Sequence, residues 1–261
     1  MGERVLSKEQ KWPDAIWIVR HGESAGNVAR DAAEAAGKPV IEIATRDADV
    51  PLSTLGEHQA TALGRWFGRM TTEQQPEVVL TSPYLRARRT AELTLEAAGI
   101  DTSDVSFVVD ERLREKEFGI LDRLTKVGIR EKYPEQSEFY RVLGKFYFRP
   151  PGGESWCDII LRLRSVIDTL TRDYRRERVL IVSHQVVVNC FRYLLERMTE
   201  EQILAADRAA EIANCSVTSY EFDPLLGRHG KLAPRLFNFV APLEEAGEPV
   251  TSKPDVPVAP K

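Results

Sequence analysis

The sequence predicts an α/β fold with a doubly wound, mostly parallel sheet and helices on both of its faces. Four short apolar runs are typical of buried strands, and stretches with helical periodicity separate them. This alternation favours right-handed crossovers and parallel pairing. A small helical lid rich in aromatic residues is expected at 120–151. We expect the four strands at 16–19, 78–80, 105–109 and 179–182.

The intervening segments justify the helices. Residues 60–70, 85–95, 159–170 and 186–198 carry apolar side chains at helical spacing, and a further helix is expected at 199–213. Residues 217–222 and 236–240 alternate in polarity and predict two edge strands. The chain thus divides into an N-terminal arm (1–13), one domain (14–240) and a tail (241–261). The tail is rich in Pro, Glu and Lys, so we expect disorder there.

Composition limits the classes of function. The chain has 261 residues, 43% of them apolar, and a net charge of −4, so no overall charge attracts it to nucleic acid or membrane. No apolar run is long enough to cross a membrane. The three cysteines are widely spaced and form no CxxC pair. We expect a cytoplasmic protein with reduced cysteines and no metal or other cofactor, and a homodimer stays open.

The end of the first predicted strand carries the first chemical signal. Arg20 and His21 follow a buried strand, where open α/β sheets bind their ligands. Gly22 allows a tight turn, and Ser24 or Asn27 can begin a helix whose amide groups attract an anion. A neutral imidazole can attack phosphorus while a guanidinium neutralises phosphate oxygens. For this motif alone, a core histidine beside an unrelated arginine is an equal alternative.

Polar side chains also follow the other predicted strands. Arg86, Glu115 and His184 each come after a strand, and parallel strands end at one edge of a sheet. The charged run around Glu115 is also typical of a solvated loop, although Phe118-Gly119 favours an anchored turn. Convergence of two histidines, two arginines and a glutamate is hard to obtain by chance. The pattern therefore predicts an anion-processing site.

Together these motifs resemble the histidine phosphatase superfamily, in its phosphoglycerate-mutase-like branch, over residues 16–222. Two departures stand out: Gln185 replaces the usual glycine after the second histidine, and Asp122-Arg123 replaces a frequent Glu-Gly. The resemblance rests on motifs that occur in the family's order: Arg20-His21-Gly22-Glu23-Ser24 with Asn27, Pro51-Leu52-Ser53, Thr81-Ser82-Pro83 with Arg86, Leu113 with Glu115, Phe118-Gly119, Gly153-Glu154-Ser155 and Val182-Ser183-His184.

The resemblance implies a role for each site residue. His21 becomes phosphohistidine, while Arg20, Arg86 and His184 bind the phosphoryl oxygens and stabilise the transition state. Glu115 protonates the leaving oxygen and then deprotonates water. This division of labour requires a neutral His21 and a protonated His184, so their pKa values should lie apart. Further substrate contacts are expected from Asn27, Ser24, Gln185, Lys145 and Arg149.

Lys145 and Arg149 flank three aromatic residues, 146–148. They either select the non-phosphate part of the substrate, or the aromatic residues merely attach the lid to the sheet. The expected activity is hydrolysis of a small phosphorylated metabolite. The alternatives are a 2,3-bisphosphoglycerate-dependent phosphoglycerate mutase and a non-catalytic protein that binds phosphorylated ligands. The region 120–151 lacks the long Arg- and Trp-rich insertion of the mutases it resembles, which favours hydrolysis.

Overall fold

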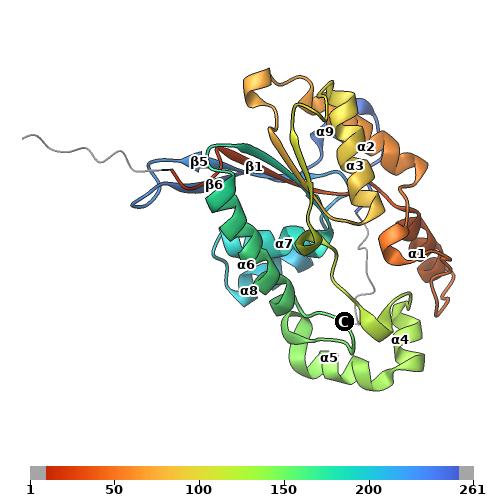
Figure 1. Ribbon diagram of the computed structural model, residues 1–261. Coiled ribbons are helices and arrows are strands. Elements are labelled where there is room, and N and C mark those ends of the chain that lie inside the picture. The colour runs from red at the N-terminus through yellow and green to blue at the C-terminus, as the bar shows by residue number, and fades with distance from the viewer. Residues whose placement is uncertain (1–9, 253–261) are drawn as a thin grey trace, which may run out of the picture.

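The computed structural model describes residues 10–252, and within them one mixed sheet has the strand order β3-β2-β4-β1-β5-β6 (Figure 1). The first four strands of this order run parallel to one another, whereas β5 runs antiparallel to β1 and β6 runs antiparallel to β5. The fold class predicted from the sequence is therefore confirmed. The strands are β1 (Ala15–Arg20), β2 (Val78–Thr81), β3 (Ser106–Val109), β4 (Arg178–Ser183), β5 (Val217–Asp223) and β6 (Lys231–Phe239).

The central strands are apolar along most of their length because helices cover both faces of the sheet. In β1, Ile16 and Ile18 enter one core, whereas Trp17 and Val19 enter the core on the opposite face. The first core faces α6, α7 and α8, and the second faces α2, α3 and α9 (Figure 1). These helices are α6 (Trp156–Asp173), α7 (Gln185–Leu195), α8 (Glu200–Ala209), α2 (Thr54–Phe67), α3 (Leu85–Ala98) and α9 (Ala241–Ala246).

The edges of the sheet differ from the prediction in two ways. β5 is an inner strand because it pairs with β1 on one side and with β6 on the other. Only β6 is the antiparallel edge, and it begins at Lys231, five residues before the predicted start. β3 forms the opposite edge and is partly exposed, because it pairs with β2 alone. Alternation in polarity therefore identified both strands, but the expectation that both lie at an edge of the sheet is wrong for β5.

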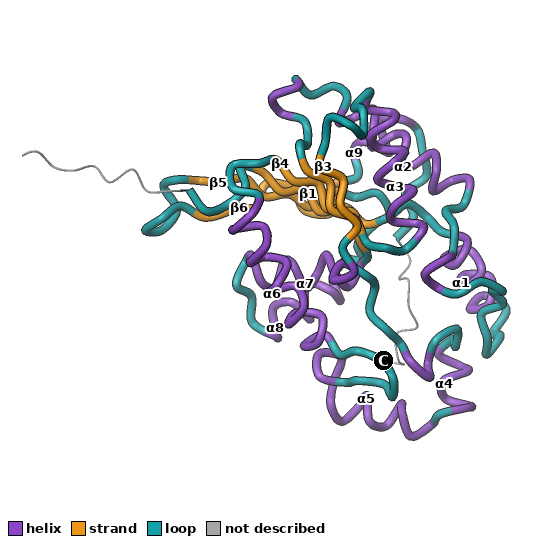
Figure 2. Tube along the Cα trace, viewed as in Figure 1, coloured by secondary structure: helices purple, strands orange, loops and turns teal. Residues whose placement is uncertain are grey.

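The region 120–151 folds apart from the sheet and contains α4 (Lys126–Lys132) and α5 (Pro134–Tyr147) (Figure 2). This lid has a small core of its own, to which Leu121, Leu124, Ile129 and Phe148 contribute. Gly144 breaks the helical path within α5 with a φ of 74°, a conformation that glycine adopts without strain. α1 (Ala25–Ala35) lies on the same side of the molecule.

The expected disorder after residue 240 is wrong for the part of the tail that the structure describes. Residues 241–246 form α9, and Leu243 is fully buried against the core that α2 helps to form. Pro242 and Leu243 are the buried residues of this short helix, and its two glutamates are exposed. The rest of the tail (253–261) and most of the N-terminal arm (1–9) lie outside the described residues. No helix among residues 10–252 is both long enough and apolar enough to cross a membrane.

Candidate active site

The register of the parallel strands brings the two predicted histidines together. β1 pairs with β4 so that Arg20 lies opposite Ser183, and the His21 amide donates to the Ser183 carbonyl at 2.9 Å. His21 and His184 follow these strands, and their ring centroids lie 5.1 Å apart. Both imidazoles are fully buried. Residues distant in sequence thus share one pocket because their strands end at the same edge.

The hydrogen bonds of His21 define its tautomer. Its Nδ1 lies 2.6 Å from the carbonyl oxygen of Gly22, and a carbonyl only accepts, so Nδ1 carries the hydrogen. The lone pair is therefore on Nε2. Arg86 donates from Nε to that nitrogen at 3.2 Å. A neutral imidazole with its lone pair on Nε2, next to a guanidinium, is suited to attack on phosphorus.

Close backbone packing explains the glycine after His21. A Cβ at Gly22 would lie 2.5 Å from the carbonyl oxygen of Gly56, and a Cβ at Gly56 would lie 1.9 Å from that of Glu23. The turn and the start of α2 therefore approach each other too closely for any side chain. The Gly22 amide also donates to the Thr90 hydroxyl at 3.0 Å. The structure thus requires glycine here for space.

Ser24 begins α1 as its N-cap. Its hydroxyl accepts from the Asn27 amide at 3.1 Å, and its own amide donates to the Asn27 side-chain oxygen at 2.9 Å. This reciprocal capping box orients both side chains at the helix start. Asn27 also lines a cavity next to Arg86. Both predicted contact residues therefore lie at the positive end of a helix, which favours an anion.

Arg86 connects the nucleophile to a loop that the sequence did not single out. Its guanidinium donates to the Asp47 carbonyl at 2.6 Å and lies 3.1 Å from the Asp47 carboxylate. It also lies 4.9 Å from the centroid of the Tyr84 ring. Arg20, by contrast, is fully buried and donates to the Ile212 carbonyl at 2.6 Å. Asp47 does not follow a predicted strand and belongs to none of the family motifs, so only the folded chain reveals its contact with Arg86.

Glu115 reaches the same pocket from the loop after β3. Its carboxylate lies 4.0 Å from Nδ1 of His184, and it accepts from the Lys116 amide at 2.7 Å. The other ring nitrogen of His184 lies 2.8 Å from the Ser82 hydroxyl. Glu115 is almost completely buried. The predicted carboxylate and both histidines therefore form one cluster.

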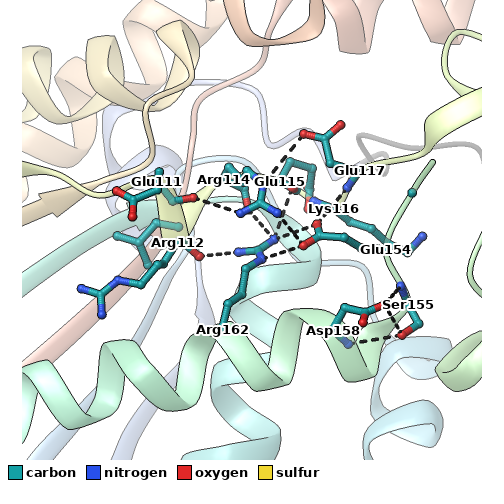
Figure 3. A network of polar contacts seen from close by, with 12 residues as sticks. Glu111, Arg112, Arg114, Glu115, Lys116, Glu117, Glu154, Ser155, Asp158 and Arg162 are labelled. Atoms are coloured by element: carbon teal, nitrogen blue, oxygen red, sulfur yellow. Dashed lines mark hydrogen bonds and ion pairs between the residues drawn. The ribbon is translucent and has the colours of Figure 1, made fainter.

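A network of charged side chains holds the loop that carries Glu115 (Figure 3). Arg162 of α6 donates to the Arg114 carbonyl at 2.8 Å and to the Glu154 carboxylate at 3.1 Å. Glu154 also accepts from Arg114 at 2.7 Å and from the Glu117 amide at 3.1 Å. The charged run is thus an anchored turn and not a solvated loop. No sequence pattern assigned this support to Arg162.

Lys116 is a buried cation that the sequence analysis missed. Only 8% of it is exposed, and its Nζ lies 4.4 Å from the centroid of the Phe118 ring. Burial is the main influence on its pKa and lowers it to about 8, although Glu115 and Glu154 act in the opposite direction. Its position next to the carboxylate at the strand end was the one signal available in the sequence.

The predicted lid cations have acidic partners within the protein. Lys145 pairs with Asp207 of α8. Arg149 is 63% exposed and lies 3.3 Å from the Asp158 carboxylate. Gln185, the first residue of α7, is buried and follows His184 directly. The structure thus brings Gln185 next to the histidine pair, whereas Lys145 and Arg149 are engaged at the base of the lid.

A cavity of about 50 Å³ lies between α1, the loop before α2 and the start of the lid. Arg86 and Asn27 line it, together with two arginines that were not predicted as contacts, Arg30 and Arg123. Arg123 donates to the carbonyl oxygens of Ile43 and Thr45 at 3.0 and 2.9 Å. It therefore ties the loop that carries Asp47 to the lid. In the sequence, Arg123 stands out only because it departs from the family pattern.

These features define a buried site of histidine, arginine and glutamate side chains at the carboxyl edge of an α/β sheet. The model of the histidine phosphatase superfamily (branch 1) matches residues 16–228. The chain belongs to this superfamily, which confirms the resemblance read from its motifs.

The matches with known proteins cover different shares of each relative's length. The 2,3-bisphosphoglycerate-dependent phosphoglycerate mutase of Rhizobium meliloti is 30% identical over 198 residues, which are 75% of this chain and 85% of the mutase. A 6-phosphofructo-2-kinase/fructose-2,6-bisphosphatase of Gallus gallus is 33% identical over 190 residues, or 72% of this chain. That match spans only 34% of the Gallus gallus protein. Among solved structures, the alpha-ribazole phosphatase from Shigella flexneri superposes with a TM-score of 0.66 at 20% identity, covering 87% of this chain and 98% of that one.

Proposed function

We infer that this chain hydrolyses small phosphomonoesters through a phosphohistidine at His21. The observation that carries this proposal is the orientation of His21, whose Nε2 lone pair faces Arg86 while His184 and Glu115 lie beside it. A nucleophile, cations for the phosphoryl oxygens and a buried carboxyl group are the parts that phosphoryl transfer to histidine needs. Membership of the superfamily supports the same reaction.

In the first step, the Nε2 lone pair of His21 forms a bond to phosphorus while the ester P–O bond breaks. Arg20, Arg86 and His184 neutralise the charge that spreads over the phosphoryl oxygens. Glu115, as the acid, gives its proton to the leaving oxygen and becomes a carboxylate.

In the second step, Glu115 takes a proton from water, whose oxygen attacks the phosphorus of phosphohistidine. The P–N bond breaks, inorganic phosphate leaves, and His21 recovers its lone pair. Further contacts to the phosphoryl group come from the first turns of two helices: Ser24 and Asn27 at the start of α1, and Gln185 at the start of α7. No cofactor enters this scheme, and the three thiols are unpaired within the described chain, which fits a cytoplasmic enzyme.

The 30% identity to a phosphoglycerate mutase favours a second candidate function, isomerisation. A mutase must keep water from its phosphohistidine while a bound intermediate reorients. The lid here is short and lacks the long insertion of the mutases that it resembles, so we propose that water reaches the phosphoenzyme. A protein that binds phosphorylated ligands without turnover is less well supported, because His21, Glu115 and His184 are assembled in one pocket.

A panel of phosphorylated metabolites and one chromogenic ester, with phosphate release as the readout, tests the proposal. We expect phosphate release from monoesters and little conversion of 3-phosphoglycerate to 2-phosphoglycerate, even with 2,3-bisphosphoglycerate added. Isomerisation much faster than phosphate release would make the mutase the correct function. Binding of phosphorylated ligands without any release of phosphate would leave the non-catalytic alternative.

A further inference from the structure

Two side-chain amides hold the backbone of the turn between His21 and Glu23. Asn214, which precedes β5, donates from Nδ2 to the carbonyl oxygen of His21 at 2.9 Å. Gln59 of α2 accepts with Oε1 from the Glu23 amide at 2.9 Å. Both amides are almost completely buried, so water does not replace these bonds. These two hydrogen bonds therefore fix the backbone of the turn that carries His21.

The opposite end of each amide contacts the segment that follows α9. Gln59 donates from Nε2 to the carbonyl oxygen of Pro249 at 2.9 Å and to the hydroxyl of Thr251 at 3.0 Å. That hydroxyl donates to the side-chain oxygen Oδ1 of Asn214 at 3.0 Å. The backbone N–H of Asn214 donates in turn to the Thr251 carbonyl at 2.7 Å. One threonine thus joins the two amides.

The backbone groups fix which way each side-chain amide points, and the Thr251 hydroxyl joins the two ends that remain. The His21 carbonyl only accepts, so Nδ2 of Asn214 faces it and leaves Oδ1 to accept from the Thr251 hydroxyl. The Glu23 amide only donates, so Oε1 of Gln59 faces it and leaves Nε2 to donate to the Thr251 hydroxyl and the Pro249 carbonyl. Without the hydroxyl, Oδ1 of Asn214 loses this buried partner, and the side chains of Asn214 and Gln59 are no longer joined.

Helix α9 holds this segment in place. Leu243 is buried in the core that α2 shares, and the Glu248 amide donates to the Leu243 carbonyl at 2.9 Å. Arg69 of the chain after α2 pairs with Glu245 at 2.6 Å. The position of Thr251 is therefore set by packing that does not involve the pocket.

We propose that Thr251 is a positioning residue for His21. It acts through Asn214 and Gln59, and through them it holds Nε2 of His21 in line for attack on phosphorus. This inference rests on the proposed role of His21 as the nucleophile. Its expected signature is a lower kcat with little change in KM, because the hydroxyl touches the support of the nucleophile and not the substrate.

The test compares Thr251→Val, which keeps the shape but removes the hydroxyl, with Thr251→Ser, which keeps the hydroxyl. Misplacement of a reacting group by a fraction of an ångström costs on the order of tenfold in rate, so we expect a fall of about that size in kcat for the valine variant. The serine variant should stay close to wild type. Val250→Thr, an exposed change in the same segment, is the matched control.

A double-mutant cycle separates positioning from a general loss of stability. In an Asn214→Ala background, Thr251→Val should lower kcat far less than in the wild type, because the path through Asn214 is already broken. An undiminished effect in that background, or a wild-type kcat for Thr251→Val, would overturn the proposal. An equal loss of kcat in Thr251→Ser, which keeps the hydroxyl, would also overturn the proposal.

A second readout does not depend on turnover. The ¹⁵N chemical shifts of the His21 imidazole report its tautomer, and Thr251→Val should shift them from the Nδ1–H form toward a mixture. Unchanged shifts would contradict the proposal even if no substrate were hydrolysed. Absence of phosphatase activity in the wild type would instead count against the proposed function, so the two failures are distinguishable.

Discussion

The carboxyl edge of the sheet and the lid are built in opposite ways. At the edge, Arg20, His21 and His184 are fully buried, and the parallel register of β1 and β4 sets their backbone. In the lid, apolar residues face outward, with Val142 65% exposed, and charges such as Arg141 pair at the surface. The edge is therefore defined by long-range pairing, whereas the lid rests on a small core of its own.

This difference suggests that chemistry and substrate selection can be changed separately. A substitution at the edge acts on groups that have no room to move, because protein interiors are close-packed. A substitution on the lid alters a surface that packs locally. We therefore expect losses of several orders of magnitude at the edge and modest, substrate-dependent changes in the lid.

Removal of the proposed nucleophile should have the largest effect. His21→Ala should lower kcat by on the order of 10⁴-fold or more, because it removes the lone pair that takes the phosphoryl group and leaves His184 to bind phosphoryl oxygens. Acid-quenched wild-type enzyme should carry a phosphate that is labile in acid, and the variant should carry none. Label on a serine, or label that persists in the variant, would show that His21 is not phosphorylated.

Glu115→Gln tests the acid and keeps the shape of the side chain. Turnover of alkyl phosphates should fall on the order of 10²–10⁴-fold, since a poor leaving group needs the proton. An activated phenolic ester leaves unaided and should lose much less. Equal losses for the two kinds of ester would mean that another group supplies the proton.

Lys116 lies between the two regions and should affect stability. Its pKa of about 8 is below that of an unfolded lysine, so at pH 7 the folded state bears the whole cost of a buried ammonium. Lys116→Met should raise the free energy of unfolding at pH 7 by at most about 3 kcal/mol, at 1.36 kcal/mol per pKa unit.

The sign of the pH dependence follows from proton binding. Between pH 8 and about 10.5 the unfolded chain binds more protons at this lysine than the folded chain, so the wild type gains stability as pH rises. The advantage of Lys116→Met should therefore shrink toward pH 10 in urea titrations. The exposed Lys132→Met is the control. A constant difference across this range would contradict the prediction.

The smallest effect is expected in the lid. If Arg149 selects the non-phosphate part of the substrate, Arg149→Ala should raise KM by several-fold for some substrates and leave the chromogenic ester unchanged. Its exposure and its pairing with Asp158 limit the loss to that of a surface ion pair, up to about 1 kcal/mol. A uniform loss of activity with a lower Tm would assign the segment to attachment of the lid alone.

The sequence by itself determined the fold class, the parallel strands and the five polar residues at their ends. These features follow from local sequence patterns: apolar runs predict buried strands, helical spacing predicts the helices, and polar residues mark the end of each strand. Because parallel strands end at one edge, the convergence of Arg20, His21 and Glu115 also followed without coordinates.

Only the tertiary structure decided what holds these residues in place. Asp47 meets Arg86, Arg162 supports the loop of Glu115, and Thr251 joins amides 37 and 192 positions away in the chain. The docking of α9 through Leu243 and the order of β5 and β6 also escaped the sequence patterns. Such contacts join residues that are distant in the sequence and become neighbours only in the folded chain, so local periodicity cannot predict them.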